Sequence, residues 1–152
     1  MYGLEQGDII ARGEGYTLYR RGTCMGMHAP GKITDSVSVS WKRAMGESFT
    51  RNGYPRFVWL DMKGCEPDNT MGERFRTASF IRESLRQIEW CAIHTGKTTG
   101  VVIVLRTMLR IIGLSHFVLY DDEAEWRAAV DAMKAGRRPG APAAGAGSTQ
   151  AR

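Results

Sequence analysis

The chain lacks the patterns that direct a protein out of the cell or into a membrane. It has only three cysteines in 152 residues, and their wide spacing and odd number argue against a disulfide framework or a zinc module. The longest apolar run, residues 101–112, contains two arginines and is too short to span a bilayer. The first ten residues show no basic and apolar secretory signal. We therefore expect a cytoplasmic protein.

The sequence also has only a small excess of charge of one sign. The sequence contains 21 basic and 16 acidic side chains, which gives a net charge of +5. Three of the arginines lie in the last 17 residues, a segment without any acid. The rest of the chain is therefore close to neutral and has little attraction for a polyanion. We expect no nucleic-acid partner.

The overall composition is that of a single globular domain. Apolar residues make up 43% and charged residues 24% of the chain, so a packed core is expected. From Gly136 onward the sequence is dominated by glycine, alanine and proline, and it offers little that could pack. We predict one domain over residues 1–135 and a disordered tail over residues 136–152.

Hydrophobic periodicity predicts helices that alternate with strands. The first 30 residues contain short β-type runs separated by glycines, as in a hairpin. Further strands are expected over residues 56–61, 90–94 and 115–120. Helices are expected over residues 34–50, 70–88 and 101–112 and from Asp121 or Asp122. This order is typical of an α/β fold with a mixed, mainly parallel sheet, an N-terminal β-hairpin and four helices.

No catalytic or metal-binding set is visible in the sequence. Gly96-Lys97-Thr98 lacks the first glycine of a phosphate-binding loop, because Cys91 stands at that position. His28, His94 and His116 are far apart and have no acidic or cysteine companions at ligand spacing. We therefore predict that the chain is not an enzyme and binds no metal or cofactor. Cys65, in a loop, is either a reactive thiol or an ordinary loop residue.

The strongest local signal is the segment from Asp61 to Thr70, between a predicted buried strand and a predicted helix. Asn69 is a suitable N-cap, and Thr70 presents a hydroxyl beside the unpaired amides of the first helical turn. A phosphate on Thr70 would lie at the positive end of the helix and would add about two negative charges to an exposed surface. A simple helix cap explains the same residues, so both interpretations stay open.

Arginines form a second pattern on the predicted helices. Arg74, Arg82 and Arg86 are separated by multiples of four residues and project from one side of their helix, and Arg106 and Arg110 repeat the spacing on the next. One interpretation is a solvated helix face balanced by nearby glutamates. The other is a surface that binds an anion or an acidic partner.

At the loop after Asp61 the chain resembles the STAS domains of anti-sigma factor antagonists and stressosome proteins. In that family a strand ends in Asp, Leu-Ser/Thr-Gly follows, and Asp-Ser/Thr begins the next helix. Asp61-Met62-Lys63-Gly64 and Asn69-Thr70 fall at the matching positions, with Asn69 in place of the acid. The chain is also similar to SEC14-like STAS relatives, whose last strand leads through an acidic turn into a helix with a tryptophan, as in Ala124-Glu125-Trp126.

The resemblance covers residues 8–134 and implies a non-catalytic, regulatory protein–protein interaction module of bacterial signalling. A kinase-like or similar signalling partner would dock on the surface around Lys63–Arg76, with Thr70 as a phosphorylation switch. The partner-binding residues that the resemblance implies are Asp61, Lys63, Asn69, Thr70, Glu73 and Arg74.

The SEC14-like similarity implies an alternative function, the binding of a small apolar or lipid ligand. The expected pocket residues are Trp41, Met45, Trp59 and Phe75. Their aromatic and apolar side chains suit such a ligand, but they also suit an ordinary core, and the sequence alone leaves both possibilities open. In either case Phe75 is expected to belong to the buried stripe of its helix.

Overall fold

The structure is a computed structural model that describes residues 1–97, 99–140 and 149–150. The described strands are β1 (Ile9–Gly13), β2 (Tyr16–Arg21), β3 (Cys24–His28), β4 (Lys32–Ile33), β5 (Phe57–Asp61), β6 (Glu66–Pro67), β7 (Trp90–His94), β8 (Phe117–Tyr120) and β9 (Thr149–Gln150). The described helices are the 3₁₀ helix η1 (Gln6–Asp8) and the α-helices α1 (Asp35–Asn52), α2 (Met71–Leu85), α3 (Thr99–Ile112) and α4 (Glu123–Lys134).

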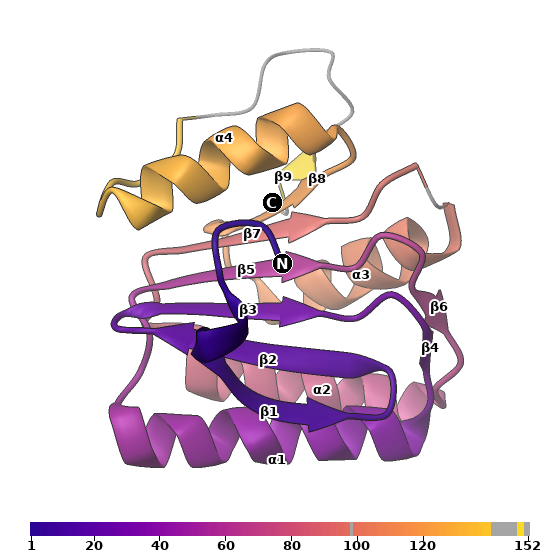
Figure 1. The fold of residues 1–152 in the computed structure, drawn as a ribbon. Coiled ribbons are helices and arrows are strands. Elements are labelled where there is room, and N and C mark those ends of the chain that lie inside the picture. Colours follow the sequence, from indigo (N-terminus) through magenta and orange to yellow (C-terminus); the bar gives the residue numbers. More distant parts are fainter. Residues whose placement is uncertain (98, 141–148, 151–152) are drawn as a thin grey trace.

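The main sheet has the strand order β1-β2-β3-β5-β7-β8-β9 (Figure 1). Strands β1, β2 and β3 pair antiparallel, whereas β3, β5, β7 and β8 are parallel to one another. Each step between neighbouring parallel strands is made through one helix, as such crossovers require. A two-residue sheet pairs β4 with β6. The predicted α/β class is confirmed, including the parallel strands, the antiparallel N-terminal portion and the four α-helices.

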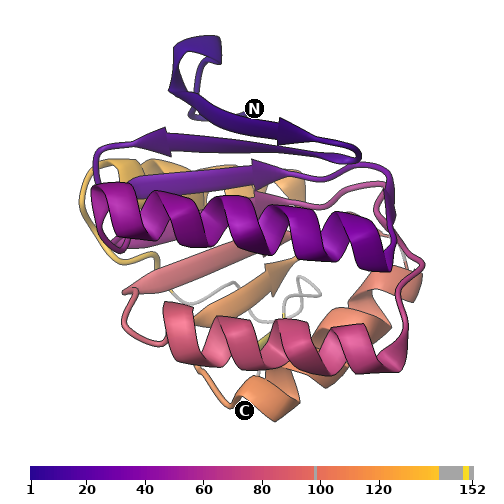
Figure 2. The same ribbon diagram turned by 90° about the horizontal axis from the view of Figure 1, so that it is seen from below.

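The sheet separates two apolar cores. Helices α1, α2 and α3 pack on one face, and α4 packs on the other together with the N-terminal residues. Figure 2 shows α1 and α2 side by side on their face of the sheet. Strand β5 illustrates the alternation that sorts its side chains: Val58 faces the three helices, whereas Phe57 and Trp59 face α4.

Local capping residues set the helix ends. Thr34 accepts a hydrogen bond from the Val37 amide at the start of α1, and Asp122 accepts one from the Glu125 amide at the start of α4. Helix α1 ends at Asn52 and Gly53 is its C-cap. The φ of Gly53 is 75°, a conformation that glycine adopts at little energetic cost, and the Gly53 amide donates to the Phe49 carbonyl. These boundaries match the sequence prediction closely.

Helix α3 confirms the helical interpretation of the apolar segment that begins near residue 101. The helix buries Val101, Leu109 and Ile112 against the three-helix core and ends before Gly113. Among the described residues, no helix is both long enough and apolar enough to cross a membrane.

The structure corrects two packing predictions and one helix boundary. Phe75 is 52% exposed rather than buried, because α2 turns Thr77, Ala78 and Leu85 toward the core instead. Trp59 lies under α4, on the opposite face from Trp41 and Met45, so these residues do not share one pocket. Helix α2 also ends at Leu85, three residues before the predicted end.

Most of the segment predicted to be a disordered tail, residues 136–152, lies outside the described residues. Its first part contacts the domain: the Arg138 guanidinium lies 5.3 Å from the centroid of the Trp90 ring, and Pro139 is buried. Further on, β9 pairs antiparallel with β8. These described residues therefore extend the contacts of the domain beyond residue 135.

Trp126 and Phe75 provide a stability test of the two-core arrangement. Trp126 is 2% exposed, stacks on His94 and donates its indole N–H to the Ala92 carbonyl at 3.2 Å. Trp126→Ala should lower the free energy of unfolding by about 3–5 kcal/mol, since it opens a large cavity under α4. Phe75→Ala, at an exposed site, should change it by less than about 1 kcal/mol. Urea denaturation of both variants checks this, and an equal loss in both would contradict the described packing.

Candidate functional site

The candidate site lies where α1 and α2 begin. Each helix is preceded by a two-residue strand, and these strands, β4 and β6, pair in parallel with Lys32 opposite Glu66 and Ile33 opposite Pro67. Figure 1 shows the two short strands side by side at one edge of the molecule. Because a threonine cap follows each strand, the pairing brings the two helix N-termini together.

Thr70 is the N-cap of α2 and is also linked to α1. Its hydroxyl accepts a hydrogen bond from the Glu73 amide at 3.3 Å and donates to Asp35 Oδ2 at 2.8 Å. Its backbone amide donates to Asp35 Oδ1 at 2.7 Å. Thr70 is nevertheless exposed. A carboxylate from the first turn of α1 thus satisfies a free amide at the start of α2.

The geometry around Thr70 favours the ionised form of Asp35. The hydrogen bonds that the Thr70 amide and hydroxyl donate lower the pKa of Asp35, and Arg76 and Arg74 lower it further. Thr70 therefore has an anion beside its hydroxyl at neutral pH. Any further negative charge on this hydroxyl would lie next to that carboxylate.

Asn69 is not the N-cap that the sequence suggested, since Thr70 has that role. The Asn69 side chain instead donates to Ser38 Oγ at 3.2 Å, which forms a second contact with α1. It also accepts a hydrogen bond from Arg74 Nε at 2.9 Å. Asn69, Thr70 and Arg74, which were all predicted to bind a partner, therefore lie together at the start of α2.

Glu73 does not lie on the predicted docking surface. Its side chain is 1% exposed and forms ion pairs with Lys42 of α1 and with Arg76 Nε, the latter at 2.8 Å. Burial raises the pKa of Glu73, but the hydrogen bonds from Lys42 and Arg76 outweigh burial and leave the pKa below its ordinary value. The sequence could not show this burial. Glu73 lies on the side of α2 that faces α1, and only the packing of the two helices shows which side that is. It is a structural residue of the α1–α2 contact.

Asp61 and Lys63 are directed to α4 rather than to Thr70. Asp61 Oδ1 lies 3.0 Å from His94 Nδ1, and the His94 ring stacks on Trp126 of α4 with ring centroids 5.0 Å apart. Lys63 Nζ lies 3.7 Å from Glu123 in the first turn of α4. The alternation of β5 explains the separation, because Asp61 shares a strand face with Trp59.

The Asp61–His94 pair is a group that the sequence analysis did not predict. His94 is 2% exposed, so the pair is closed off from the surface on the imidazole side. Burial raises the pKa of Asp61, but hydrogen bonds from His94 and the Lys63 amide leave it below its ordinary value. Only the register of β5 and β7 could have revealed the pair, since Asp61 and His94 are 33 residues apart.

Cys65 is a structural loop residue. It is 1% exposed, and burial together with the nearby Glu66 raises the pKa of its thiol to about 11. The reactive thiolate is therefore scarce at neutral pH. Among the described residues, no group of three or more histidine, cysteine or acidic side chains lies close enough to hold a metal ion.

Comparison with known proteins adds a result on the fold. A crystal structure of an uncharacterised protein of the DUF3478 family from Shewanella loihica PV-4, described as having a SpoIIAA-like fold, superposes with a TM-score of 0.51. The alignment covers 73% of this chain and 89% of that chain. This chain has a SpoIIAA-like fold. The sequence identity is 11%, so the similarity concerns the SpoIIAA-like fold alone.

The SpoIIAA-like fold confirms the fold that the STAS resemblance implied. No protein-family model matches the sequence, and no curated protein matches it. The motif at Asp61–Thr70 and the last strand and helix led to the same fold as the superposition. The geometry of the helix N-termini, rather than a relative of known activity, must therefore support any functional conclusion.

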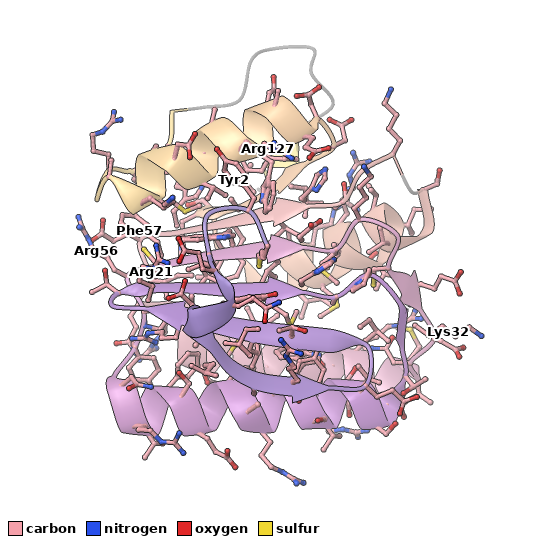
Figure 3. All side chains as sticks on the ribbon, in the orientation of Figure 1. Tyr2, Arg21, Lys32, Arg56, Phe57 and Arg127 are labelled. Carbon is pink, nitrogen blue, oxygen red and sulfur yellow. The ribbon has the colours of Figure 1, made fainter. Side chains whose placement is uncertain are left out.

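Lys42 tests the structural assignment of Glu73. Lys42→Met should lower the free energy of unfolding at pH 7 by about 2 kcal/mol, because it removes one partner of a buried carboxylate. Lys32→Met is the matched control. Lys32 is exposed and points away from the fold in Figure 3, so its loss should cost less than about 0.5 kcal/mol.

The pH dependence of this loss provides a second measurement. Because the folded pKa of Glu73 is lowered, its ionic contribution is present above the unfolded pKa of about 4.3 and is lost as pH falls through the folded pKa. The stability difference between wild type and Lys42→Met should therefore shrink between pH 7 and pH 3 in urea titrations. A difference that stays constant over this range would contradict the role of Glu73.

Proposed function

We propose that this chain is a non-catalytic regulatory module that binds a signalling protein through the surface around the start of α2. Phosphorylation of Thr70 switches that binding. The observation that supports this proposal is the exposed Thr70 hydroxyl, whose hydrogen bond to Asp35 joins two helices. Modification of this one atom acts on both helices at once.

The electrostatics of this contact suit a switch. Phosphorylated Thr70 no longer has a proton to donate to Asp35, and it adds about two negative charges beside the carboxylate. Repulsion between unit charges about 4 Å apart costs on the order of 1–4 kcal/mol near a protein surface. Attraction of the phosphate to the helix N-terminus offsets about 1 kcal/mol. The carboxylate should therefore leave its position, and the surface shared by α1 and α2 should change.

The burial of His94 in the Asp61–His94 pair favours a non-catalytic role. A carboxylate and an imidazole form the usual pair for general base catalysis, which requires that the imidazole reach a substrate. His94 lies under Trp126 and is 2% exposed, so a substrate has no access to its ring. The pair instead fixes the carboxyl ends of β5 and β7 against α4.

Thr70→Glu tests the switch without knowledge of the partner. The variant should keep the far-UV circular dichroism of the wild type, while amide hydrogen exchange at the starts of α1 and α2 should become at least about fivefold faster, because the introduced carboxylate and Asp35 repel each other. Adding Asp35→Asn to Thr70→Glu should restore slow exchange. Mass spectrometry of proteolytic fragments measures both effects.

Ser79→Glu is the control for this experiment. Ser79 is an exposed residue of α2, about two turns after Met71, and its replacement should leave exchange at both N-termini unchanged. Equal exchange in wild type and Thr70→Glu would contradict the switch. So would equal affinities of the two proteins for a partner recovered with the wild type.

An apolar cavity supports a second candidate function, the binding of a small apolar ligand or part of a lipid. The cavity has a volume of about 90 Å³ and lies between the sheet and helices α1, α2 and α3. Trp41 and Met45 line it as predicted, whereas Trp59 and Phe75 do not. The volume is below the range of about 300–1,000 Å³ for drug-sized ligands, so a group of a few heavy atoms fits without rearrangement.

Native mass spectrometry tests the cavity. If the cavity binds such a ligand, the purified protein should carry an adduct that organic solvent extracts. Ile81→Trp, at a residue that lines the cavity, should remove the adduct by filling the space. Val39→Trp, on the exposed face of α1, should retain it. Wild-type protein without any adduct would contradict this second function.

A further inference from the structure

A groove on the molecular surface runs between α2 and α3, outside the site at Thr70. Met71 and Phe75 of α2 form one wall, Ile103 and Ile111 of α3 form the other, and Met108 lies between them. The groove has a volume of about 190 Å³. The groove adjoins the cavity under the helices, since Val104 and Met108 line both.

The groove exposes large apolar side chains in one place. Met71 is 55% exposed, Phe75 52%, Ile103 60% and Ile111 43%. The other large apolar side chains that are exposed in the described part of the chain lie on β1, on α1 and in the loop after α1. Single exposed apolar residues are ordinary, but four around one hollow form a patch of the kind found at interaction sites.

The charges around this groove are basic. Arg74 lines it. Arg82 follows Phe75 by seven residues and Arg110 follows Ile103 by seven, so each exposed apolar stripe continues into an arginine two turns later.

Acidic side chains are few around the groove. Asp35 lies at the end nearest Thr70, to which it is hydrogen-bonded, and the charge of Arg74 acts on it there. Helix α3 contains no acid, and Glu73 of α2 is buried against α1. Glu83, the exposed acid of α2, lies one turn from Phe80, which packs on Trp41 of α1. It is therefore on the side of α2 toward α1 and does not neutralise the basic rim of the groove.

We propose that the α2–α3 groove binds an acidic amphipathic helix of the signalling partner. Apolar side chains of that helix, spaced three or four residues apart, enter the hollow, and its carboxylates meet Arg74, Arg82 and Arg110. The methionines adapt their shape to such an insertion. A second copy of this chain would place basic rims against each other, and a flat membrane surface would leave the concave floor empty.

This inference rests on the proposed function and extends it, because the groove begins beside the switch. Met71 directly follows Thr70, so a phosphate on Thr70 would lie at one end of the groove. The same phosphate would repel the carboxylates of the bound helix. Phosphorylation would therefore weaken docking both through this repulsion and through the displacement of Asp35.

A synthetic peptide tests the groove directly. The probe is an 18-residue fluorescein-labelled helix with leucines at helical spacing on one face and glutamates on the other, and the reference is a scrambled peptide of the same composition. Fluorescence anisotropy at low salt should give a Kd of about 10–100 µM for the probe and binding at least tenfold weaker for the scrambled peptide. Phe75→Glu and Ile103→Glu should each weaken binding at least tenfold.

Val39→Glu is the matched control, because Val39 is an equally exposed apolar residue on α1. It should leave the Kd of the probe unchanged, and Arg110→Glu should weaken binding about threefold. Equal binding of probe and scrambled peptide, or equal affinities of wild type and Phe75→Glu, would overturn the proposal. Sedimentation with anionic phosphatidylglycerol vesicles that Phe75→Glu abolishes, or a dimer that the same substitution abolishes, would assign the groove to a membrane or to a second copy instead.

Thr70→Glu separates this inference from the proposed switch. Weaker peptide binding in Thr70→Glu would support both. Binding that depends on Phe75 but is unchanged in Thr70→Glu would support the groove and contradict the switch. A peptide that does not bind, together with altered hydrogen exchange in Thr70→Glu, would overturn the groove and leave the switch supported.

Discussion

Parallel pairing of β3, β5 and β7 is the constraint on which the candidate site depends. Each parallel step returns the chain through a helix that starts from the same edge of the sheet, so α1 and α2 begin as neighbours. The short β4–β6 pair then fixes the distance between the two starting turns. Without this arrangement the Asp35 carboxylate could not reach the Thr70 amide and hydroxyl, which are 35 residues away in the sequence.

The α1–α2 contact combines a rigid part with an accessible part. Glu73 is buried and forms ion pairs with the largely buried Lys42 and the exposed Arg76, and loss of Lys42 would leave the buried carboxylate without its better-shielded partner. The Asp35–Thr70 contact one turn earlier is exposed, so water can replace each hydrogen bond when it breaks. A change at Thr70 can therefore alter the ends of two helices while Glu73 keeps the helices packed together.

The two faces of the sheet have different roles in this arrangement. On the α4 face, the buried His94 stacks on Trp126 and is hydrogen-bonded to Asp61, which holds the strand ends. Figure 3 shows Tyr2 beside Arg127 of α4, where the guanidinium lies 4.8 Å from the centroid of the Tyr2 ring. On the other face, three helices cover an apolar cavity and leave a groove between α2 and α3. The start of α2 at Thr70 and the groove thus both lie on the three-helix face.

The sequence by itself determined the four α-helices, the longer strands of the main sheet, their order and the α/β class, but not the two-residue strands β4, β6 and β9. Periodicity, the caps Thr34 and Asp122, and Gly53 act over a few residues, and such local effects can be recognised in a single chain. The motif from Asp61 to Thr70 also led to the fold that the superposition shows. Only the tertiary structure decided which side chains meet around that segment. It buried Glu73, exposed Phe75 and paired Thr70 with Asp35, because the rotation of a helix and the register of a sheet depend on neighbours that are distant in sequence.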